Sequence, residues 1–218
     1  YLEFTGGEPF MIKEHFELLK RAADLGYAKN IRIHYNTNGT IYPEEFVNVW
    51  NSFEHVEIAF SIDNVGKRFE YERYLAKWDE VNANIKKFEQ LKQASNKIDL
   101  QLCFTVNILN VLYLDELLNW AKDIDFDTLH WNMLHGPYEM SIACLPDDAK
   151  SKVIEALKNK SFDKKYKNDV KNVIAMIVNG TSTDSSSLIK KLSVTDQYRK
   201  EHLSQTHPEL AEILKYGN

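Results

Sequence analysis

The sequence of 218 residues has only two cysteines, Cys103 and Cys144, which lie far apart and in no metal-ligand spacing. This scarcity argues against a disulfide framework and favours a reducing compartment, so we expect a cytoplasmic protein. The seven histidines show no HExxH or HxxxH spacing. A zinc or non-haem iron site of those types therefore has no support in the sequence.

The sequence also lacks long apolar runs and an excess of positive charge. Its apolar runs are too short to cross a bilayer and no signal-peptide pattern opens the chain, so we expect no membrane partner. The formal net charge of −5 argues against general nucleic-acid binding, which usually needs a basic surface. Because the first residue is not Met, a targeting segment lost with the native N-terminus stays open.

The composition, with 44% hydrophobic and 27% charged residues, is that of a globular protein. Up to about residue 135, short β-rich runs alternate with amphipathic helical patterns, which favours parallel strands joined by crossover helices. We predict strands near 1–5, 31–35, 56–62, 98–106 and 127–132. Two parts follow: an α/β domain over 1–135 and a mostly helical extension over 136–218, with a Ser/Thr-rich loop at 181–187.

The stretch TGGEP follows the first predicted strand and precedes a helical pattern. Gly6 and Gly7 allow the backbone to approach a ligand closely, because no Cβ intervenes. Glu8 supplies a carboxylate that suits an ammonium group, and Pro9 directs the chain into the next helix. A plain strand-to-helix turn with an exposed glutamate explains the same letters equally well.

Polar residues also end the next three predicted strands. Asn38 lies in a TNG turn, and Asn107 follows the fourth strand. Ser61 and Asp63 are the first and last residues of the SID segment at the end of the third strand. Each alone is a common turn or capping residue. Because the carboxyl ends of parallel strands meet at one rim, we expect these side chains to converge on a single cleft.

FTGGEP, followed by TNG and by a strand ending in SID, resembles the radical S-adenosylmethionine (radical SAM) superfamily over about residues 1–135. The resemblance implies a partial parallel (β/α) barrel, here without its first strand, that binds S-adenosylmethionine and a [4Fe–4S] cluster. It implies these cofactor-binding residues: Gly6, Gly7, Glu8, Pro9, Asn38, Ser61, Asp63 and Asn107. Within that set, the GGEP turn would hold the methionine amino group of the cofactor.

The cluster-binding CxxxCxxC loop of that superfamily is absent from this sequence. Two explanations stay open: an amino-terminal truncation, which the strand at the first residue favours, or a degenerate member that never binds a cluster. In either case we expect the chain as given to be inactive. Residues 137–146, 196–199 and 208–210 resemble a C-terminal twitch region, and Cys144 alone does not suffice for an auxiliary cluster.

The resemblance implies that the intact enzyme uses a reduced cluster to cleave S-adenosylmethionine, and that the resulting 5′-deoxyadenosyl radical abstracts hydrogen from a substrate. The substrate, a peptide or a small molecule, and the catalytic residues stay unidentified. The implied electron donor is a flavodoxin or a ferredoxin. The alternative is a non-catalytic barrel remnant that acts as a binding or scaffold module. The exposed edge of residues 1–4 also predicts a homodimer through that strand, or its coverage by the C-terminal helices.

Overall fold

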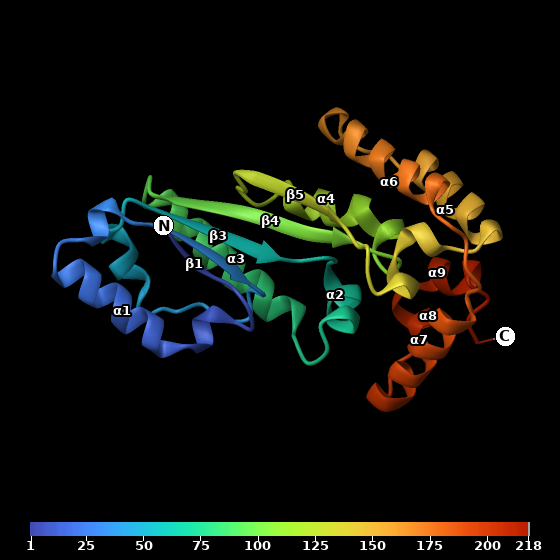
Figure 1. Ribbon diagram of the computed structural model, residues 1–218, viewed down its shortest axis with the longest axis horizontal. Helices are drawn as coiled ribbons and strands as arrows, with labels where there is room; N and C mark the ends of the chain where they lie inside the picture. The colour runs from blue at the N-terminus through green and yellow to red at the C-terminus, as the bar shows by residue number, and fades with distance from the viewer. Residues whose placement is uncertain (218) are drawn as a thin grey trace. The chain divides into compact units, whose positions relative to one another are not determined.

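The computed structural model describes residues 1–217 and contains a five-stranded sheet (Figure 1). Every strand lies beside its neighbour in sequence, in the order β1-β2-β3-β4-β5. The strands are β1 (Leu2–Phe4), β2 (Arg32–Thr37), β3 (His55–Ser61), β4 (Ile98–Val106) and β5 (Thr128–Met133). They match the five predicted ranges to within three residues at each end.

The sheet is parallel. The pairs β1–β2, β2–β3 and β3–β4 are parallel, with Phe4 opposite Tyr35 in the first pair. On β5, the Asp127 N–H donates to the Leu100 carbonyl and the Leu134 N–H to the Val106 carbonyl, so residue numbers rise together on β4 and β5. The predicted α/β class is confirmed, and the sequential parallel order is that of a partial (β/α) barrel followed by helices.

Helices occupy most of the remaining chain, and in residues 1–217 none is both long and apolar enough to cross a membrane. The α-helices are α1 (Lys13–Asp24), α2 (Gly66–Glu72), α3 (Trp78–Gln93), α4 (Leu114–Ala121), α5 (Asp147–Asn159), α6 (Lys167–Asn179), α7 (Ser186–Arg199), α8 (Leu203–Thr206) and α9 (Pro208–Ile213). Short 3-10 helices are η1 (Pro9–Met11), η2 (Ala28–Asn30), η3 (Val47–Ser52), η4 (Val111–Tyr113), η5 (Tyr138–Met140), η6 (Ile142–Cys144) and η7 (Lys164–Tyr166).

Local composition explains two of these segments. Pro43 is followed by a turn and then by η3, since two valines and two asparagines within the six residues VNVWNS are poor helix formers. The charged run 67–73 forms most of α2, whose apolar Phe69 and Tyr71 are buried.

The chain forms two compact units. Unit 1 comprises Tyr1–Ile62, Leu75–Phe104 and Trp120–His130, and unit 2 comprises Asp63–Tyr74, Thr105–Asn119 and Trp131–Asn218, of which residues up to 217 are described. The predicted division at residue 135 stays a prediction.

The core of unit 1 is aromatic. Phe10 packs its ring 4.9 Å from Tyr35, 5.9 Å from Trp50 and 5.7 Å from Phe88, measured between centroids. The Trp50 indole N–H donates to the fully buried Tyr35 hydroxyl at 3.3 Å. Large aromatic rings stabilise a core strongly when their polar atoms are also hydrogen-bonded. This aromatic core holds Phe10, and with it the segment just after the TGGEP turn, in place.

Unit 2 is organised around the buried carboxylate of Asp196 in α7. It accepts hydrogen bonds from the Tyr71 hydroxyl at 2.8 Å, the Tyr216 hydroxyl at 2.6 Å and the Leu203 N–H at 2.8 Å. These donors come from α2, from the C-terminal end and from α8. A single carboxylate with three donors therefore ties together segments that the sequence separates widely.

A close backbone approach also fixes unit 2 near Gly180, which follows α6. A Cβ atom on Gly180 would lie 2.1 Å from the carbonyl oxygen of Ala143, although Gly180 has an ordinary φ of −71°. The buried Lys150 ammonium donates to the Gly180 carbonyl at 2.6 Å. Glycine is required here for space rather than for backbone conformation.

Candidate functional site

The TGGEP turn links β1 to η1 in unit 1. Gly6 and Gly7 have φ angles of +83° and +60°, in the left-handed region that glycine adopts without strain. No atom lies within 4 Å of the point where either Cβ would stand, and both residues are exposed. The glycine pair therefore gives this backbone its shape and leaves it open to a close approach from solvent.

Glu8 and Pro9 turn inward and are buried. Glu8 caps η1, where its Oε1 accepts a hydrogen bond from the Phe10 N–H at 3.2 Å. The same oxygen accepts one from the Thr37 hydroxyl at 2.8 Å, and Oε2 accepts one from the Asn38 N–H at 2.8 Å. With only 7% of its surface exposed, Glu8 joins the turn after β1 to the turn after β2.

The turn after β2 uses its own polar atoms to hold its shape. The Asn38 side-chain oxygen accepts from the Thr40 N–H at 2.9 Å, a side-chain turn typical of asparagine. The Gly39 N–H donates to the Thr37 hydroxyl at 3.1 Å, and Asn84 of α3 donates to the Gly39 carbonyl at 3.0 Å. Asn38 thus contributes its backbone N–H to Glu8 and its side-chain oxygen to its own turn.

Ser61 is the last residue of β3 and is half-buried. Its Cα pairs with that of Cys103 on β4, and the next residue, Ile62, donates its N–H to the Cys103 carbonyl at 3.1 Å. Among residues 1–217 the Ser61 hydroxyl has no hydrogen-bond partner, so it is available to a ligand.

Asp63 is the first residue of a unit 2 segment and uses both side-chain oxygens. Its Oδ1 accepts from the Thr105 N–H at 2.8 Å, and its Oδ2 accepts from the Arg73 guanidinium at 2.7 Å. Its backbone carbonyl accepts from the Asn110 side chain at 3.0 Å. Asp63 therefore joins the start of this segment to the residues that follow β4.

Asn107 lies in the same cluster and is 8% exposed. Its N–H donates to the Asn110 side chain at 2.8 Å, and its own side-chain oxygen accepts from the Leu109 N–H at 2.7 Å. The Asn107 amide nitrogen donates to the Thr105 carbonyl at 3.2 Å and, at 3.5 Å, to Glu72.

Glu72, the last residue of α2, is the titratable group at the centre of this cluster. Its Oε1 accepts from the Asn64 amide at 2.7 Å. Desolvation raises the pKa of Glu72 to about 7, while the hydrogen bond from Asn64 works in the opposite direction and the charge of Asp63 adds to the rise. This carboxyl can therefore take up or release a proton near neutral pH.

The structure thus brings together Glu8 with Asn38 in unit 1, and Asp63 with Asn107 in unit 2. Sequence reasoning missed Asn64, Glu72, Arg73 and Asn110 as members of the second cluster. Asn64 alone had a readable signal, since it directly follows Asp63 of the SID segment, whereas Asn110 lies 47 positions from Asp63. The convergence of all the predicted residues on one cleft stays a prediction.

The residues present do not fit an iron–sulfur cluster. Cys103 lies in β4, where burial raises the pKa of its thiol, and Cys144 ends η6. In residues 1–217, no group of three or more His, Cys, Asp and Glu side chains could hold a metal ion. This chain by itself provides no set of three thiolates.

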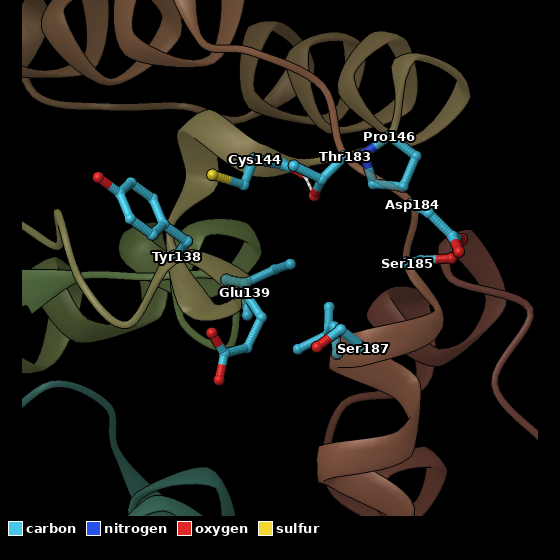
Figure 2. A pocket seen from close by; sticks show the side chains of 10 residues that line it. Tyr138, Glu139, Cys144, Pro146, Thr183, Asp184, Ser185 and Ser187 are labelled. Atoms are coloured by element: carbon cyan, nitrogen blue, oxygen red, sulfur yellow. Dashed lines mark hydrogen bonds between the residues drawn. The ribbon is translucent and has the colours of Figure 1, made fainter.

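Cys144 instead lines two neighbouring cavities of unit 2, of about 210 and 360 Å³, together with Tyr138 and Thr183. Figure 2 shows the smaller cavity, with Tyr138 and Glu139 on one side, Ser187 on the other, and Cys144 next to Thr183. The Thr183 hydroxyl donates to the Cys144 carbonyl at 2.7 Å, which fixes one wall. Glu139, also on the lining, is paired with Lys191 at 2.9 Å.

The fold is similar to solved structures of one protein, anSMEcpe. The native protein with bound AdoMet and the Cp18Cys peptide has 18% identity and a TM-score of 0.50, over 88% of this chain and 52% of that chain. The native form with AdoMet alone has 18% identity and a TM-score of 0.51 over the same shares. The form with AdoMet and the Kp18Cys peptide has 19% identity and a TM-score of 0.51, again over 88% and 52%.

This chain therefore spans about half the length of the solved structures it matches. No protein-family model and no curated protein sequence matches it. At this level of identity, the likeness establishes a shared fold.

Proposed function

We propose that this chain is part of a radical SAM enzyme and contributes the turn that holds the methionine end of S-adenosylmethionine. The carrying observation is the TGGEP turn, whose exposed Gly6 and Gly7 leave open space beside the backbone. The fold shared with AdoMet-bound structures supports the same conclusion, as does the order of the GGEP, TNG and SID segments.

The Gly6 and Gly7 carbonyls are the proposed acceptors for the cofactor's ammonium group. Glu8 acts mainly by holding this turn, because three internal hydrogen bonds already use its carboxylate. Its negative charge still favours a cation nearby, and a charge-assisted hydrogen bond of this type contributes roughly 1.5–3 kcal/mol. Pro9, buried, fixes the direction of the chain after the turn.

The sugar and carboxylate of the cofactor are assigned to Ser61, whose hydroxyl is available, and to Asp63. The Asp63 carboxylate is already bound to the Arg73 guanidinium and the Thr105 N–H, so its position is fixed before any ligand binds. Asn38 and Asn107 hold the adjoining turns and complete the proposed set. Bound S-adenosylmethionine would supply the reacting group, and these residues would bind and orient it.

The cluster thiolates must come from outside these 218 residues, because Cys103 and Cys144 do not suffice. We therefore expect this chain alone to be inactive, as a segment of a cytoplasmic enzyme. The electron donor of the intact protein is proposed to be a flavodoxin or a ferredoxin. Residues 136–218 are proposed to form a twitch-like extension.

A peptide is the proposed substrate class. Two of the solved structures with this fold contain a peptide beside AdoMet. β1 is one of the two terminal strands of the sheet, and its edge is proposed as the homodimer contact.

Anaerobic reconstitution of a longer chain that includes the upstream codons tests this function. We expect iron and sulfide incorporation, together with reductant-dependent formation of 5′-deoxyadenosine from S-adenosylmethionine. A reconstituted chain that binds the cluster but forms no 5′-deoxyadenosine would contradict the proposal.

The shortage of thiolates favours one alternative, a barrel remnant that serves as a binding or scaffold module. The encoding DNA separates the two functions. A CxxxCxxC motif within a few dozen codons upstream of Tyr1 supports the enzyme, whereas an in-frame start at that position supports the module.

A further inference from the structure

A second feature of unit 2, separate from the proposed cofactor turn, is a groove lined by residues of α5, α6 and the segment that joins them. Figure 1 labels both helices. Its volume is about 490 Å³, within the range typical of ligand pockets. Apolar side chains form the floor and lysines form the rim. The lining residues are Leu157, Lys158, Lys160, Ser161, Phe162, Lys167, Val170, Lys171 and Ile174.

The spacing of these residues explains the groove. Val170 and Ile174 lie four residues apart on one face of α6, and Leu157 faces them from the last turn of α5. Leu157 and Val170 are 1% and 8% exposed, whereas Phe162 and Ile174 remain half-buried. The floor is therefore concave and offers two partly open apolar surfaces to an incoming side chain.

The rim carries unbalanced positive charge. Over residues 152–171 there are seven lysines and three acidic residues, a local charge of +4, although the whole chain carries −5. Lys160 is paired with Asp115 at 2.7 Å. Lys158, Lys167 and Lys171 are exposed and, within residues 1–217, have no ion-pair or hydrogen-bond partner.

We propose that this groove binds an acidic segment of a partner protein, with one apolar side chain in the groove and carboxylates on the three free lysines. A fatty acid is a poorer fit to the groove, because its single carboxylate cannot engage three separate lysines on the rim. A membrane surface is also a poorer fit, because membrane-binding helices present their apolar side chains outward, whereas here the apolar side chains lie at the bottom of a groove. A single-stranded nucleic acid would find one lining aromatic ring, Phe162, on which to stack its bases.

The chain's overall negative charge does not oppose a short acidic segment strongly. At physiological salt the screening length is about 8 Å, so the local lysines dominate over distant acidic residues. Charge complementarity of this kind sets the association rate and the choice of partner, while the apolar side chain anchors the complex.

Fluorescence anisotropy of the whole chain tests the proposal. The probe is a labelled peptide of alternating Asp and Glu with one central Phe. Two matched peptides carry either Asn and Gln in place of the acids, or Ser in place of the Phe. We expect the acidic Phe peptide to bind at least about tenfold more tightly than either, and to weaken as salt rises.

A triple variant, Lys158→Glu with Lys167→Glu and Lys171→Glu, should weaken binding about tenfold or more. The matched control reverses three exposed lysines of unit 1, Lys20, Lys29 and Lys86, and changes the net charge equally. We expect the control to bind like the unmodified chain. Circular dichroism melting of both variants checks that they fold.

Ile174→Ser tests the floor independently of charge. It should weaken the Phe peptide severalfold and leave the Ser peptide unchanged. Equal losses in both triple variants, or equal binding of the acidic and amide peptides, would overturn the proposal. Preferential binding of phosphatidylglycerol vesicles, decanoate or a single-stranded oligonucleotide over the acidic peptide would also overturn it.

Discussion

Glu8 in unit 1 and Glu72 in unit 2 are two carboxylates held by different kinds of donor. Glu8 accepts from two backbone N–H groups and one hydroxyl, all at 3.2 Å or less. Glu72 accepts from two side-chain amides, one of them at 3.5 Å, and lies near the charge of Asp63. The first carboxylate serves as a tie between turns, and the second changes its charge near pH 7.

The comparison teaches that the hydrogen-bond donors around a buried or half-buried carboxylate help to decide its role, either joining two segments or changing its charge near neutral pH. The backbone N–H groups that bind Glu8 belong to two turns and are fixed in place, so the carboxylate joins those turns. Glu72 accepts two hydrogen bonds, one of them long, and desolvation is the largest influence on the pKa of its carboxyl. Four substitutions test this contrast.

Glu8→Ala should have the largest effect on the free energy of unfolding, a loss of about 3 kcal/mol. The change leaves the Phe10 N–H, the Thr37 hydroxyl and the Asn38 N–H without their acceptor. Urea unfolding measures the effect. Glu17→Ala, on an exposed position of α1, is the matched control and should stay within about 0.5 kcal/mol. Equal losses in both variants would mean that Glu8 is not a structural tie.

Glu72→Gln should change the pH dependence of stability by about 1–2 kcal/mol. The folded pKa of about 7 exceeds the unfolded value of 4.5, so the folded state binds the extra proton between these values. Stability from this group is therefore fully present below about pH 4.5 and is lost as pH rises through 7. Water reaches part of the Glu72 side chain and screens its interactions, so we expect the effect to stay at about 1–2 kcal/mol.

Unfolding curves of the Glu72→Gln variant and the unmodified chain between pH 4 and pH 8 provide the measurement. We expect the decline with rising pH to flatten in the variant. An unchanged slope would show that Glu72 does not titrate in this range.

Thr37→Val should cost about 1–2 kcal/mol of unfolding free energy. It removes the hydroxyl that donates to Glu8 and accepts from the Gly39 N–H, while the shape of the side chain is kept. In a double-mutant cycle with Glu8→Ala, the double variant should lose less stability than the sum of the two single losses, since the two residues share a hydrogen bond. Strict additivity would count against the tie between the two turns.

Ser61→Ala should have the smallest effect on stability, within about 0.5 kcal/mol. Its hydroxyl has no partner among residues 1–217, so folding does not depend on it. In the reconstituted longer enzyme the same change should weaken S-adenosylmethionine binding by about fivefold, measured by calorimetry, as expected for one lost hydrogen bond. A stability loss comparable to that of Thr37→Val would assign Ser61 to the fold.

The strands were predictable because their pattern is local. β4 alternates buried and half-buried residues along its whole length, and the glycine-containing turns after β1 and β2 mark their ends. The TGGEP and TNG turns were likewise predictable as turns, because Gly6, Gly7 and Gly39 adopt positive φ angles that favour glycine. Their role as a site stays a prediction. The hydrogen bonds that Thr37 and Asn38, about thirty positions away, donate to Glu8 could not be predicted from the sequence.

The second cluster was missed for a related reason. Glu72 belongs to a dense run of charges that usually marks a solvated helix face. Its environment depends on Asn107, which lies 35 residues further along the chain. Folding also supplies the desolvation that raises the pKa of Glu72, against the opposing effect of the Asn107 amide, so the raised pKa has no signature in the local sequence.

Gly180 has a consequence for sequence variation. The Ala143 carbonyl occupies the space of any Cβ, so even alanine at position 180 would require the backbone to move. A saturation library should therefore retain only glycine there. Tolerance elsewhere in the adjoining segment should stay broad, because residues 181–185 are mostly exposed. One invariant position inside a variable loop is a pattern usually attributed to ligand binding, and at Gly180 it would arise from packing alone.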